Sequence, residues 1–297
     1  MSEVVLVEAR AESAVRDFVS LTKPRIISLL LVTTVAPMFV AGDPTWLEVL
    51  IVVIGGYLMA GGANAVNMYM DRDIDDVMAR TRLRPIPSGR LTPAAVLSFG
   101  VALAVAATWL LGHFVNLLTA ALALGGFYFY VFIYTRWLKR SSPQNIVIGG
   151  AAGAFPPLVG WAAVTGSVDL AGLYLFLIVF YWTPPHFWAL ALLKQKDYGK
   201  AGVPMAPLVW GERETMNQML WYTLILFALT ILPVAFGAFG LLYLACAVVL
   251  NAILLRGILR VRSAEVWTKP AWWVYKYSLL YLALLFTAMV IDRQLPL

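Results

Sequence analysis

Residues 46–76 read WLEVLIVVIGGYLMAGGANAVNMYMDRDIDD, a mostly apolar run that ends in a cluster of acidic side chains. About 20 apolar residues are enough for a helix to cross the hydrocarbon core of a bilayer. Asn64 and Asn67 lie inside this run, and Asp71 and Asp75 follow at its end. The stretch therefore predicts a transmembrane helix whose polar side chains lead from the membrane interior to one membrane surface.

The rest of the chain repeats the apolar pattern. Of 297 residues, 61% are apolar and 13% are charged, whereas about 25% are charged in typical soluble domains. A soluble protein could not cover so much apolar surface. We therefore predict an all-α polytopic membrane protein, with an N-terminal cytoplasmic segment over residues 1–24 and a transmembrane domain of nine helices over residues 25–297. The predicted spans are residues 25–41, 46–70, 94–112, 115–134, 144–164, 169–193, 218–237, 239–258 and 271–291. Thr22 and Pro24 predict the start of the first span, because a capping hydroxyl and a proline at the first helical position favour a helix start.

The basic residues predict the orientation in the membrane. Of 22 Lys and Arg residues, 21 fall at or before the start of the first span or in the loops that lie on the same side, and Arg293 falls on the other side. The positive-inside rule then makes the N-terminus and the long loops cytoplasmic, with the C-terminus outside an inner (cell) membrane. Since topology accounts for the net charge of +6, that charge does not indicate a nucleic-acid partner.

The spacing of Asn67, Asp71 and Asp75 predicts a ladder of side-chain oxygens. Residues four apart advance about 6 Å along a helix and stay on one face. Stacked carboxylates resist ionising together unless a cation neutralises them, and Mg²⁺ binds such oxygens together with substrate phosphates. One cysteine and two histidines leave few other ligands. The sequence therefore predicts a Mg²⁺ site, with a solvated acidic helix end as the alternative.

Basic side chains around this ladder predict a binding site for a phosphate-rich anion, because arginine forks and lysine ammonium groups bind phosphate oxygens. The alternative is that each basic residue serves only topology or contacts lipid headgroups. The predicted diphosphate-binding residues are Lys23, Arg25, Arg80, Arg84, Lys139, Arg140, Lys194 and Lys196.

His186 follows two prolines inside the sixth predicted span. An ionisable group at that depth normally faces the protein interior and is often functional, although a neutral histidine that joins two helices is the alternative. Aromatic residues such as Tyr134 and Tyr181 would enclose an isoprenoid chain and stabilise a carbocation by cation–π attraction. Packing and membrane-belt roles are the alternative for most of these rings.

The pattern Asn67-x-x-x-Asp71-x-x-x-Asp75 in a nine-span chain resembles the first aspartate motif of the UbiA superfamily of intramembrane prenyltransferases. Within that superfamily, the chain is most similar to the branch that transfers a farnesyl group to protoheme IX. The stretches that carry this resemblance are residues 21–25, 64–75, 80–89, 134–140, 145–150, 183–190 and 197–205.

The resemblance implies nine helices around a central cavity that opens to the membrane. It implies that farnesyl diphosphate, haem b and water react to give haem O and diphosphate, with Mg²⁺ as cofactor and enzymes of later haem A synthesis as contacts. Many superfamily members have a second DxxxD motif, but here Leu193 and Ala201 stand four residues from Asp197 on either side, so the number of metal ions is open. The implied metal ligands are Asn67, Asp71, Asp75 and Asp197. The implied contacts to the prenyl chain or porphyrin are Asn64, Tyr134, Asn145 and Tyr181, with His186 as a further catalytic residue that ligates or orients the porphyrin or acts as a base.

Two other functions fit parts of the pattern. One is a relative in the same superfamily that prenylates a quinone precursor or another tetrapyrrole. The other is a haem or metal-ion transporter. Transporter sites commonly lie near the bilayer midplane, whereas Asp71 and Asp75 come at the membrane edge beside arginine-rich loops. That position favours diphosphate chemistry.

Overall fold

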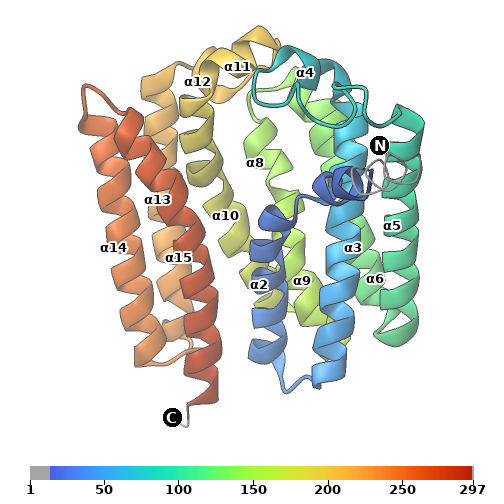
Figure 1. The fold of residues 1–297 in the computed structure, drawn as a ribbon. Coiled ribbons are helices and arrows are strands. Elements are labelled where there is room, and N and C mark those ends of the chain that lie inside the picture. The colour runs from blue at the N-terminus through green and yellow to red at the C-terminus, as the bar shows by residue number, and fades with distance from the viewer. Residues whose placement is uncertain (1–13, 296–297) are drawn as a thin grey trace, which may run out of the picture.

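The computed structural model describes residues 14–295, and within that range helices alternate with short connections and no strand is present (Figure 1). Nine helical stretches in the same range are long and apolar enough to cross a membrane, which confirms the predicted all-α fold with nine spans. In chain order the elements are a helix over residues 14–22, α2 (Pro24–Ala41), α3 (Trp46–Met70), α4 (Arg72–Val77), α5 (Pro93–Phe114), α6 (Leu117–Tyr128), the π-helix η1 (Phe129–Leu138), α7 (Lys139–Ser141), α8 (Asn145–Gly149), α9 (Ala151–Thr165), α10 (Leu170–Leu193), α11 (Gln195–Lys200), α12 (Ala206–Val209), α13 (Glu212–Ala235), α14 (Leu241–Ser263) and α15 (Thr268–Gln294).

The long helices stand side by side and form two groups. In one group α3 packs against α5, and α9 packs against α2 and α6. In the other, α13 and α15 pack against α10, and α14 packs against α13 and α15. Contacts of α9 with α10 and of α2 with α15 join the groups. Short helices α4, α11 and α12 cover one end of the bundle, at the top of Figure 1. We call this end the loop end.

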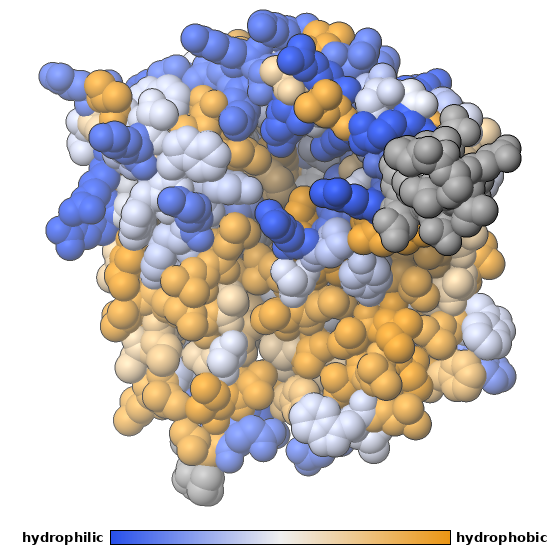
Figure 2. Space-filling view, in the orientation of Figure 1, coloured by the Kyte–Doolittle hydropathy of each residue, from blue (hydrophilic) through white to orange (hydrophobic). Residues whose placement is uncertain are grey.

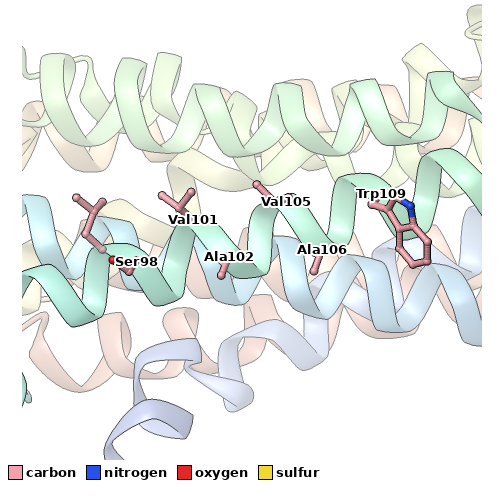
Figure 3. Close-up of a pocket in the computed structure, with 7 residues that line it drawn as sticks. Ser98, Val101, Ala102, Val105, Ala106 and Trp109 are labelled. Atoms are coloured by element: carbon pink, nitrogen blue, oxygen red, sulfur yellow. The ribbon is translucent and has the colours of Figure 1, made fainter.

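The outer surface is apolar along the helices and polar at the loop end (Figure 2). Many large apolar side chains point outward, as expected where lipid rather than water surrounds the helices. An apolar groove of about 790 Å³ lies along the outer face of α5 (Figure 3) and is of the kind that lipid chains cover. Its lining residues are Leu97, Ser98, Val101, Ala102, Val105, Ala106 and Trp109.

Several predicted spans differ from the structure in detail, and three of the differences have a structural cause. The fourth continues past its predicted end as η1, whose widened turns follow directly on α6. The fifth is divided at Gly150 into α8 and α9. The seventh begins earlier, at Glu212, because acidic residues in the first turn favour a helix N-terminus even though they are not apolar.

The start of α2 also differs from its prediction. The residue before the helix is Lys23, not Thr22, and it adopts a left-handed conformation with φ 55° and ψ 62°. Thr22 Oγ1 donates to Val19 O (2.8 Å) instead of capping the helix. A left-handed residue other than glycine costs about 1–3 kcal/mol, so surrounding contacts must hold it. This turn lets the helix over residues 14–22 lie across the bundle (Figure 1).

A close backbone contact joins α2 and α9. A Cβ atom at Gly160 would lie 1.8 Å from the carbonyl oxygen of Thr34, which no relaxation of a flexible side chain can relieve. Small residues at such crossings let membrane helices approach closely. A Cβ atom at Gly153, on the same helix, would meet nothing within 4 Å.

These two glycines make a matched pair. We expect Gly160→Ala to separate α2 from α9 and to lower the free energy of unfolding by about 1–3 kcal/mol, as overpacking does. Gly153→Ala should leave it unchanged or raise it slightly, because alanine favours helix by up to about 1 kcal/mol. Thermal unfolding in detergent measures both, and equal midpoints for the two variants would contradict the close contact.

Candidate functional site

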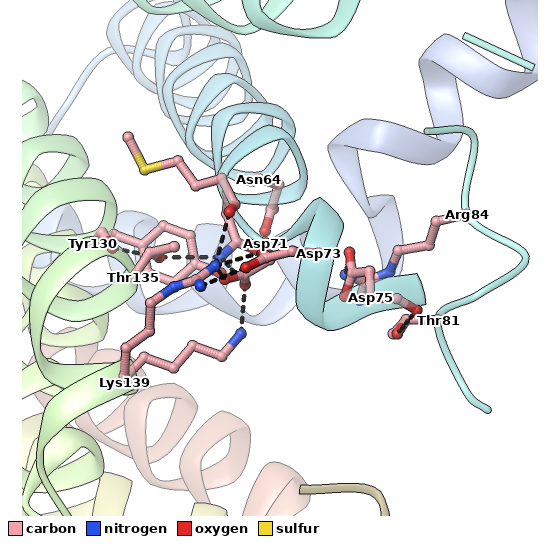
Figure 4. A network of polar contacts seen from close by, with 12 residues as sticks. Asn64, Asp71, Asp73, Asp75, Thr81, Arg84, Tyr130, Thr135 and Lys139 are labelled. Carbon is pink, nitrogen blue, oxygen red and sulfur yellow. Dashed lines mark hydrogen bonds and ion pairs between the residues drawn. The ribbon is translucent and has the colours of Figure 1, made fainter. Parts of the chain in front are cut away.

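The predicted ladder begins with Asn67 and Asp71, both buried at the loop end of α3. Asn67 Nδ2 donates to Asp71 Oδ2 (2.8 Å) and to Thr135 Oγ1 of η1 (3.0 Å). Thr135 Oγ1 in turn donates to Tyr130 O (2.8 Å), five residues back along the π-helix. The side chains of Asp71, Thr135 and Lys139 converge in Figure 4. We call the residues Asn67, Asp71, Thr135 and Lys139 the Asp71 centre.

Each polar residue of the ladder has a basic partner. Lys139 Nζ pairs with Asp71 Oδ2, and Arg84 NH1 lies 2.6 Å from Asp75 Oδ2. Lys23 Nζ donates to Asn64 Oδ1 (3.1 Å) and to Asn67 Oδ1 (3.4 Å). A buried charge without such a partner would be strongly destabilising, so these pairs make the carboxylates tolerable at the membrane edge.

Asp75 lies apart from the Asp71 centre. The backbone hydrogen bonds from Asp71 N to Asn67 O and from Asp75 N to Asp71 O continue the helical pattern across the junction of α3 and α4. However, Figure 4 shows Asp75 beside Arg84 and Thr81, on the side away from Lys139. Thr81 Oγ1 donates to the Asp75 carbonyl (2.9 Å) and ties the following loop to α4. The ladder is thus divided into two parts, each with its own cation.

The donor atoms at the Asp71 centre fit a hard cation. No group of three His, Cys, Asp or Glu side chains close enough to hold a metal occurs within residues 14–295. Mg²⁺ does not require such a group, because one or two carboxylates with substrate phosphates and waters complete its shell. Asp71 Oδ1 is buried and has no hydrogen-bond partner, and Arg140 NH2 lies 3.7 Å from it. Buried polar atoms are nearly always paired, so this oxygen is a ready ligand position.

Asp73, two residues after Asp71, binds Arg140 through two hydrogen bonds of 2.7 Å. Arg140 NH2 also donates to Met70 O (2.9 Å) and so satisfies a carbonyl in the last turn of α3. The guanidinium hydrogen bonds lower the pKa of Asp73 to about 2. Arg140 is therefore a structural bridge from α7 to the α3–α4 junction.

The remaining predicted basic and acidic residues lie outside these pairs. Lys194 Nζ sits 5.5 Å above the Trp272 ring. Asp197 lies half-buried on α11, and no ion pair or side-chain hydrogen bond that the structure describes involves its carboxylate. The exposed side chains that likewise form no ion pair with the described residues are Arg25, Arg80 and Lys196.

Two of the four predicted substrate contacts lie beside the Asp71 centre. Asn64 Nδ2 donates to Thr22 O (3.0 Å), so this side chain holds the left-handed turn as well as the Lys23 ammonium. The Tyr134 ring stacks on Tyr130 with centroids 5.6 Å apart. It also lies against Gly149, where a Cβ would be 2.3 Å from a ring carbon.

The other two predicted contacts face different neighbours. Asn145 is fully buried and Nδ2 donates to Ser142 O (2.7 Å), while its Oδ1 has no partner. Tyr181 packs against Tyr222 of α13 with ring centroids 5.7 Å apart. The structure therefore places Tyr181 between α10 and α13 and does not join it to the Asp71 centre.

His186 is buried between α10 and α15. Its ring stacks between those of Trp182 and Tyr275, with centroid distances of 4.5 Å and 4.9 Å. Its Nδ1 lies 2.7 Å from Ser278 Oγ. Ser278 Oγ donates its only proton to Tyr275 O (2.9 Å). Both hydrogen bonds form together only when Nδ1 carries the ring proton, which leaves Nε2 as the acceptor.

Several residues of the site were not predicted. Thr135 lies within a stretch that carries the family resemblance, but only a π-helix brings its hydroxyl to Asn67. Asp73 and Thr81 border predicted residues, and only the folded loop shows their partners. Ser278 lies 92 residues after His186, and no local pattern links them.

Comparisons with known proteins match most of the chain. The model of the UbiA prenyltransferase family matches residues 29–285. With nine apolar helices, this match identifies an integral membrane protein. Protoheme IX farnesyltransferase of Roseiflexus sp. (strain RS-1) is 55% identical over 99% of this chain, which spans 55% of that relative. Protoheme IX farnesyltransferase of Symbiobacterium thermophilum is 54% identical over 94% of each chain. The chain thus spans about half the length of the first of these relatives.

Solved structures share the fold at low sequence identity. A structure of digeranylgeranylglyceryl phosphate synthase superposes with a TM-score of 0.76 at 18% identity, over 94% of this chain and 98% of that one. A UbiA homolog from Archaeoglobus fulgidus, bound to DMAPP and Mg²⁺, superposes with a TM-score of 0.66 at 15% identity, over 92% of this chain and 99% of that one.

The lowered pKa of Asp73 predicts an acid-sensitive contribution to stability. Because the folded-state pKa is about 2 and the ordinary value is 3.8, the Asp73–Arg140 pair stabilises the fold fully above the ordinary value, and its contribution is lost as pH falls toward 2. We expect Asp73→Asn to be less stable than the unmodified chain at pH 6, with the difference shrinking between pH 4 and pH 2. Unfolding in detergent across this range measures it, and a difference independent of pH would contradict the assignment.

Proposed function

Because the chain belongs to the UbiA prenyltransferase family, we propose that it transfers the farnesyl group of farnesyl diphosphate to a vinyl group of haem b, with addition of water, to give haem O and diphosphate. Relatives named protoheme IX farnesyltransferase support the acceptor and the donor, and one of them matches this chain over 94% of both sequences. The observation that carries the proposal is the Asp71 centre, where a buried carboxylate with one unpartnered oxygen meets lysine and arginine side chains at a membrane edge.

We propose that the loop end faces the cytoplasm, with the C-terminus outside an inner membrane. The 21 basic residues on one side of the spans support this orientation. Farnesyl diphosphate would then reach the Asp71 centre with its charged head at the loop end and its chain among the helices. A division into residues 1–24 and 25–297 and contact with enzymes of later haem A synthesis stay predictions.

Mg²⁺ would be held at the Asp71 centre by Asn67 Oδ1 and Asp71, and would stabilise the negative charge that develops on the departing diphosphate. Asp75, which lies apart beside Arg84, and Asp197 of α11 stay predicted metal ligands, and the number of ions stays open. Binding of DMAPP and Mg²⁺ by the Archaeoglobus homolog supports this choice of cation. The basic partners then exchange roles. Lys139, Arg84 and Lys23 leave the ladder oxygens and donate to diphosphate oxygens, so each cation keeps an anionic or polar partner.

Ionisation breaks the bond between the farnesyl carbon and the diphosphate oxygen, whose electron pair leaves with the diphosphate. The vinyl π electrons of haem b then form the new carbon–carbon bond. Water adds to the resulting cation and loses a proton. The stacked rings of Tyr130 and Tyr134 lie next to Thr135 and would face the allylic cation, while the apolar helices exclude water until that bond has formed.

On the acceptor side we propose that His186 acts on the porphyrin through Nε2. The hydrogen bond from Nδ1 to Ser278 Oγ supports this, because it directs the basic lone pair to the other nitrogen. That nitrogen has two possible tasks, ligation of the haem iron or acceptance of the proton from the added water. Ser278 is then a positioning residue.

The metal assignment predicts that Asp71→Ala abolishes farnesyl transfer, with a loss of at least about 100-fold in kcat, as for other groups that stabilise transition-state charge. Asp43→Asn, in an exposed loop away from the loop end, is the matched control and should keep full activity. Membranes supplied with farnesyl diphosphate and haem b are assayed by the product mass. Turnover by Asp71→Ala would refute the assignment, whereas farnesylation of an aromatic acid in place of haem b would favour the quinone-precursor alternative.

The tautomer assignment predicts separate effects on the two substrates. Ser278→Ala should raise the KM for haem b about fivefold, the equivalent of one lost hydrogen bond of about 1 kcal/mol, and leave the KM for farnesyl diphosphate unchanged. Ser278→Thr should restore the value. A Soret band of bound haem that shifts in His186→Ala indicates iron ligation, and a parallel rise in both KM values would exclude an acceptor-side role.

A further inference from the structure

The side chain of Arg90 joins two segments of the loop end that are distant in the sequence. Arg90 lies in the loop between α4 and α5, close to the start of α5. Its Nε lies 3.0 Å from Oδ1 and 2.9 Å from Oδ2 of Asp17, in the helix over residues 14–22. Its NH2 donates to Leu83 O (3.1 Å), farther back in the same loop. One guanidinium group thus fixes the helix over residues 14–22 to the loop between α4 and α5.

Each of these two segments presents a cation to the polar face of α3 and α4. The helix over residues 14–22 leads directly into Lys23, whose ammonium donates to two asparagine side chains of α3. Leu83 directly precedes Arg84, which pairs with the outer carboxylate of the ladder (Figure 4). Among the described residues, the side chain of Arg90 forms no hydrogen bond or ion pair with the Asp71 centre itself. Any effect of Arg90 on that centre therefore acts through the two segments that it joins.

Lys23 depends on such support because its backbone is left-handed, with φ 55°. Thr22 Oγ1, at the end of the preceding helix, lies 2.9 Å from Tyr57 OH and fixes that end. Asp17 lies about 9 Å farther back along the same helix. Among the described residues, its pair with Arg90 is the one ion pair that anchors this helix. The pair therefore sets the direction from which the helix brings Lys23 to α3.

The exposure of this ion pair separates a positioning role from a stabilising one. The side chain of Arg90 is 42% exposed, and that of Asp17 is 13% exposed. An ion pair so open to water contributes little to the free energy of unfolding. The planar guanidinium nevertheless fixes the orientation of its partners, which a lysine ammonium does not. Loss of Arg90 should therefore change where the two cations lie more than whether the chain folds.

We propose that Arg90 is a positioning residue for the diphosphate of the prenyl donor, an inference that rests on the proposed function. When a metal-complexed diphosphate binds, the side chains of Lys23 and Arg84 exchange their oxygens on α3 and α4 for diphosphate oxygens. Arg90 keeps the two backbone segments in place during this exchange, so that both cations reach the same anion.

Steady-state kinetics with farnesyl diphosphate and haem b test the positioning role. Arg90→Ala should raise the KM for farnesyl diphosphate about tenfold, as loss of a contact that supports binding groups does, and leave the KM for haem b unchanged. Arg90→Lys keeps the charge but not the fork, and should restore part of the affinity. Arg82→Ala removes the same charge from an exposed position in the same loop and should change neither KM. An unchanged KM in Arg90→Ala, or an equal rise in both KM values, would overturn the proposal.

Amine labelling of the purified full chain tests the position of Lys23 without turnover. Peptide mass spectrometry measures how fast an amine-reactive reagent modifies Lys23 and Lys139. Arg90→Ala and Asp17→Asn should each speed the labelling of Lys23 and leave that of Lys139 unchanged, because the partner of Lys139 stays in place. Equal labelling of Lys23 in these variants and in the unmodified chain would contradict the anchoring of Lys23 through Arg90.

Protection by magnesium diphosphate separates this inference from the proposed reaction. Magnesium diphosphate should slow the labelling of Lys23, and Arg90→Ala should need an about tenfold higher concentration for the same protection. If the unmodified chain makes no haem O, the proposed reaction fails, and the protection still decides the role of Arg90. No protection in the unmodified chain, or equal protection in Arg90→Ala, would refute the positioning role.

Discussion

A carboxylate at the edge of a bilayer must be neutralised by a nearby cation, because little water is present to solvate it. In this structure the cations come from the turn before α2, from the loop after α4 and from α7. The contacts of Lys23 with Asn67 and of Lys139 with Asp71 therefore join segments that are far apart in the chain, and the pair of Arg84 with Asp75 closes the loop after α4. The loop end is held together by the same charges that form the candidate site, so its architecture and its chemistry depend on one constraint.

Irregular backbone makes these pairings possible. The left-handed Lys23 directs its ammonium to Asn64 and Asn67. The π-helix turns Thr135 toward Asn67, and the junction at Asp71 separates the two carboxylates of the ladder. Strained or widened turns are stable only where many contacts hold them, and they recur at functional sites. Here these three irregular positions coincide with the candidate site.

Hydropathy and spacing predicted the nine spans and the buried polar residues of α3, because length, apolar content and a four-residue repeat are local properties of a sequence. The hydrogen-bond and ion-pair partners of these residues could not be predicted from the sequence. The α-helical period of 3.6 residues does not describe a π-helix, so it could not predict that Thr135 faces Asn67. The contact of His186 with Ser278 depends on how α15 packs on α10, which no local pattern shows. The basic residues were predicted as a group, but only the fold separates Lys23 at the ladder from the exposed Arg25.

The pairing of the ladder oxygens with lysine and arginine side chains also affects which anions bind weakly at this site. A membrane surface is crowded with phosphate groups, and an open set of lysines and arginines would bind lipid headgroups continually. At the Asp71 centre, a bare phosphate meets cations that already have partners, and a bare metal ion meets Lys139 already paired with the carboxylate. A metal ion and a diphosphate that arrive together leave every charge compensated. Under the proposed function, the paired resting arrangement would discriminate a metal-complexed diphosphate from the abundant monophosphates of the surrounding lipid.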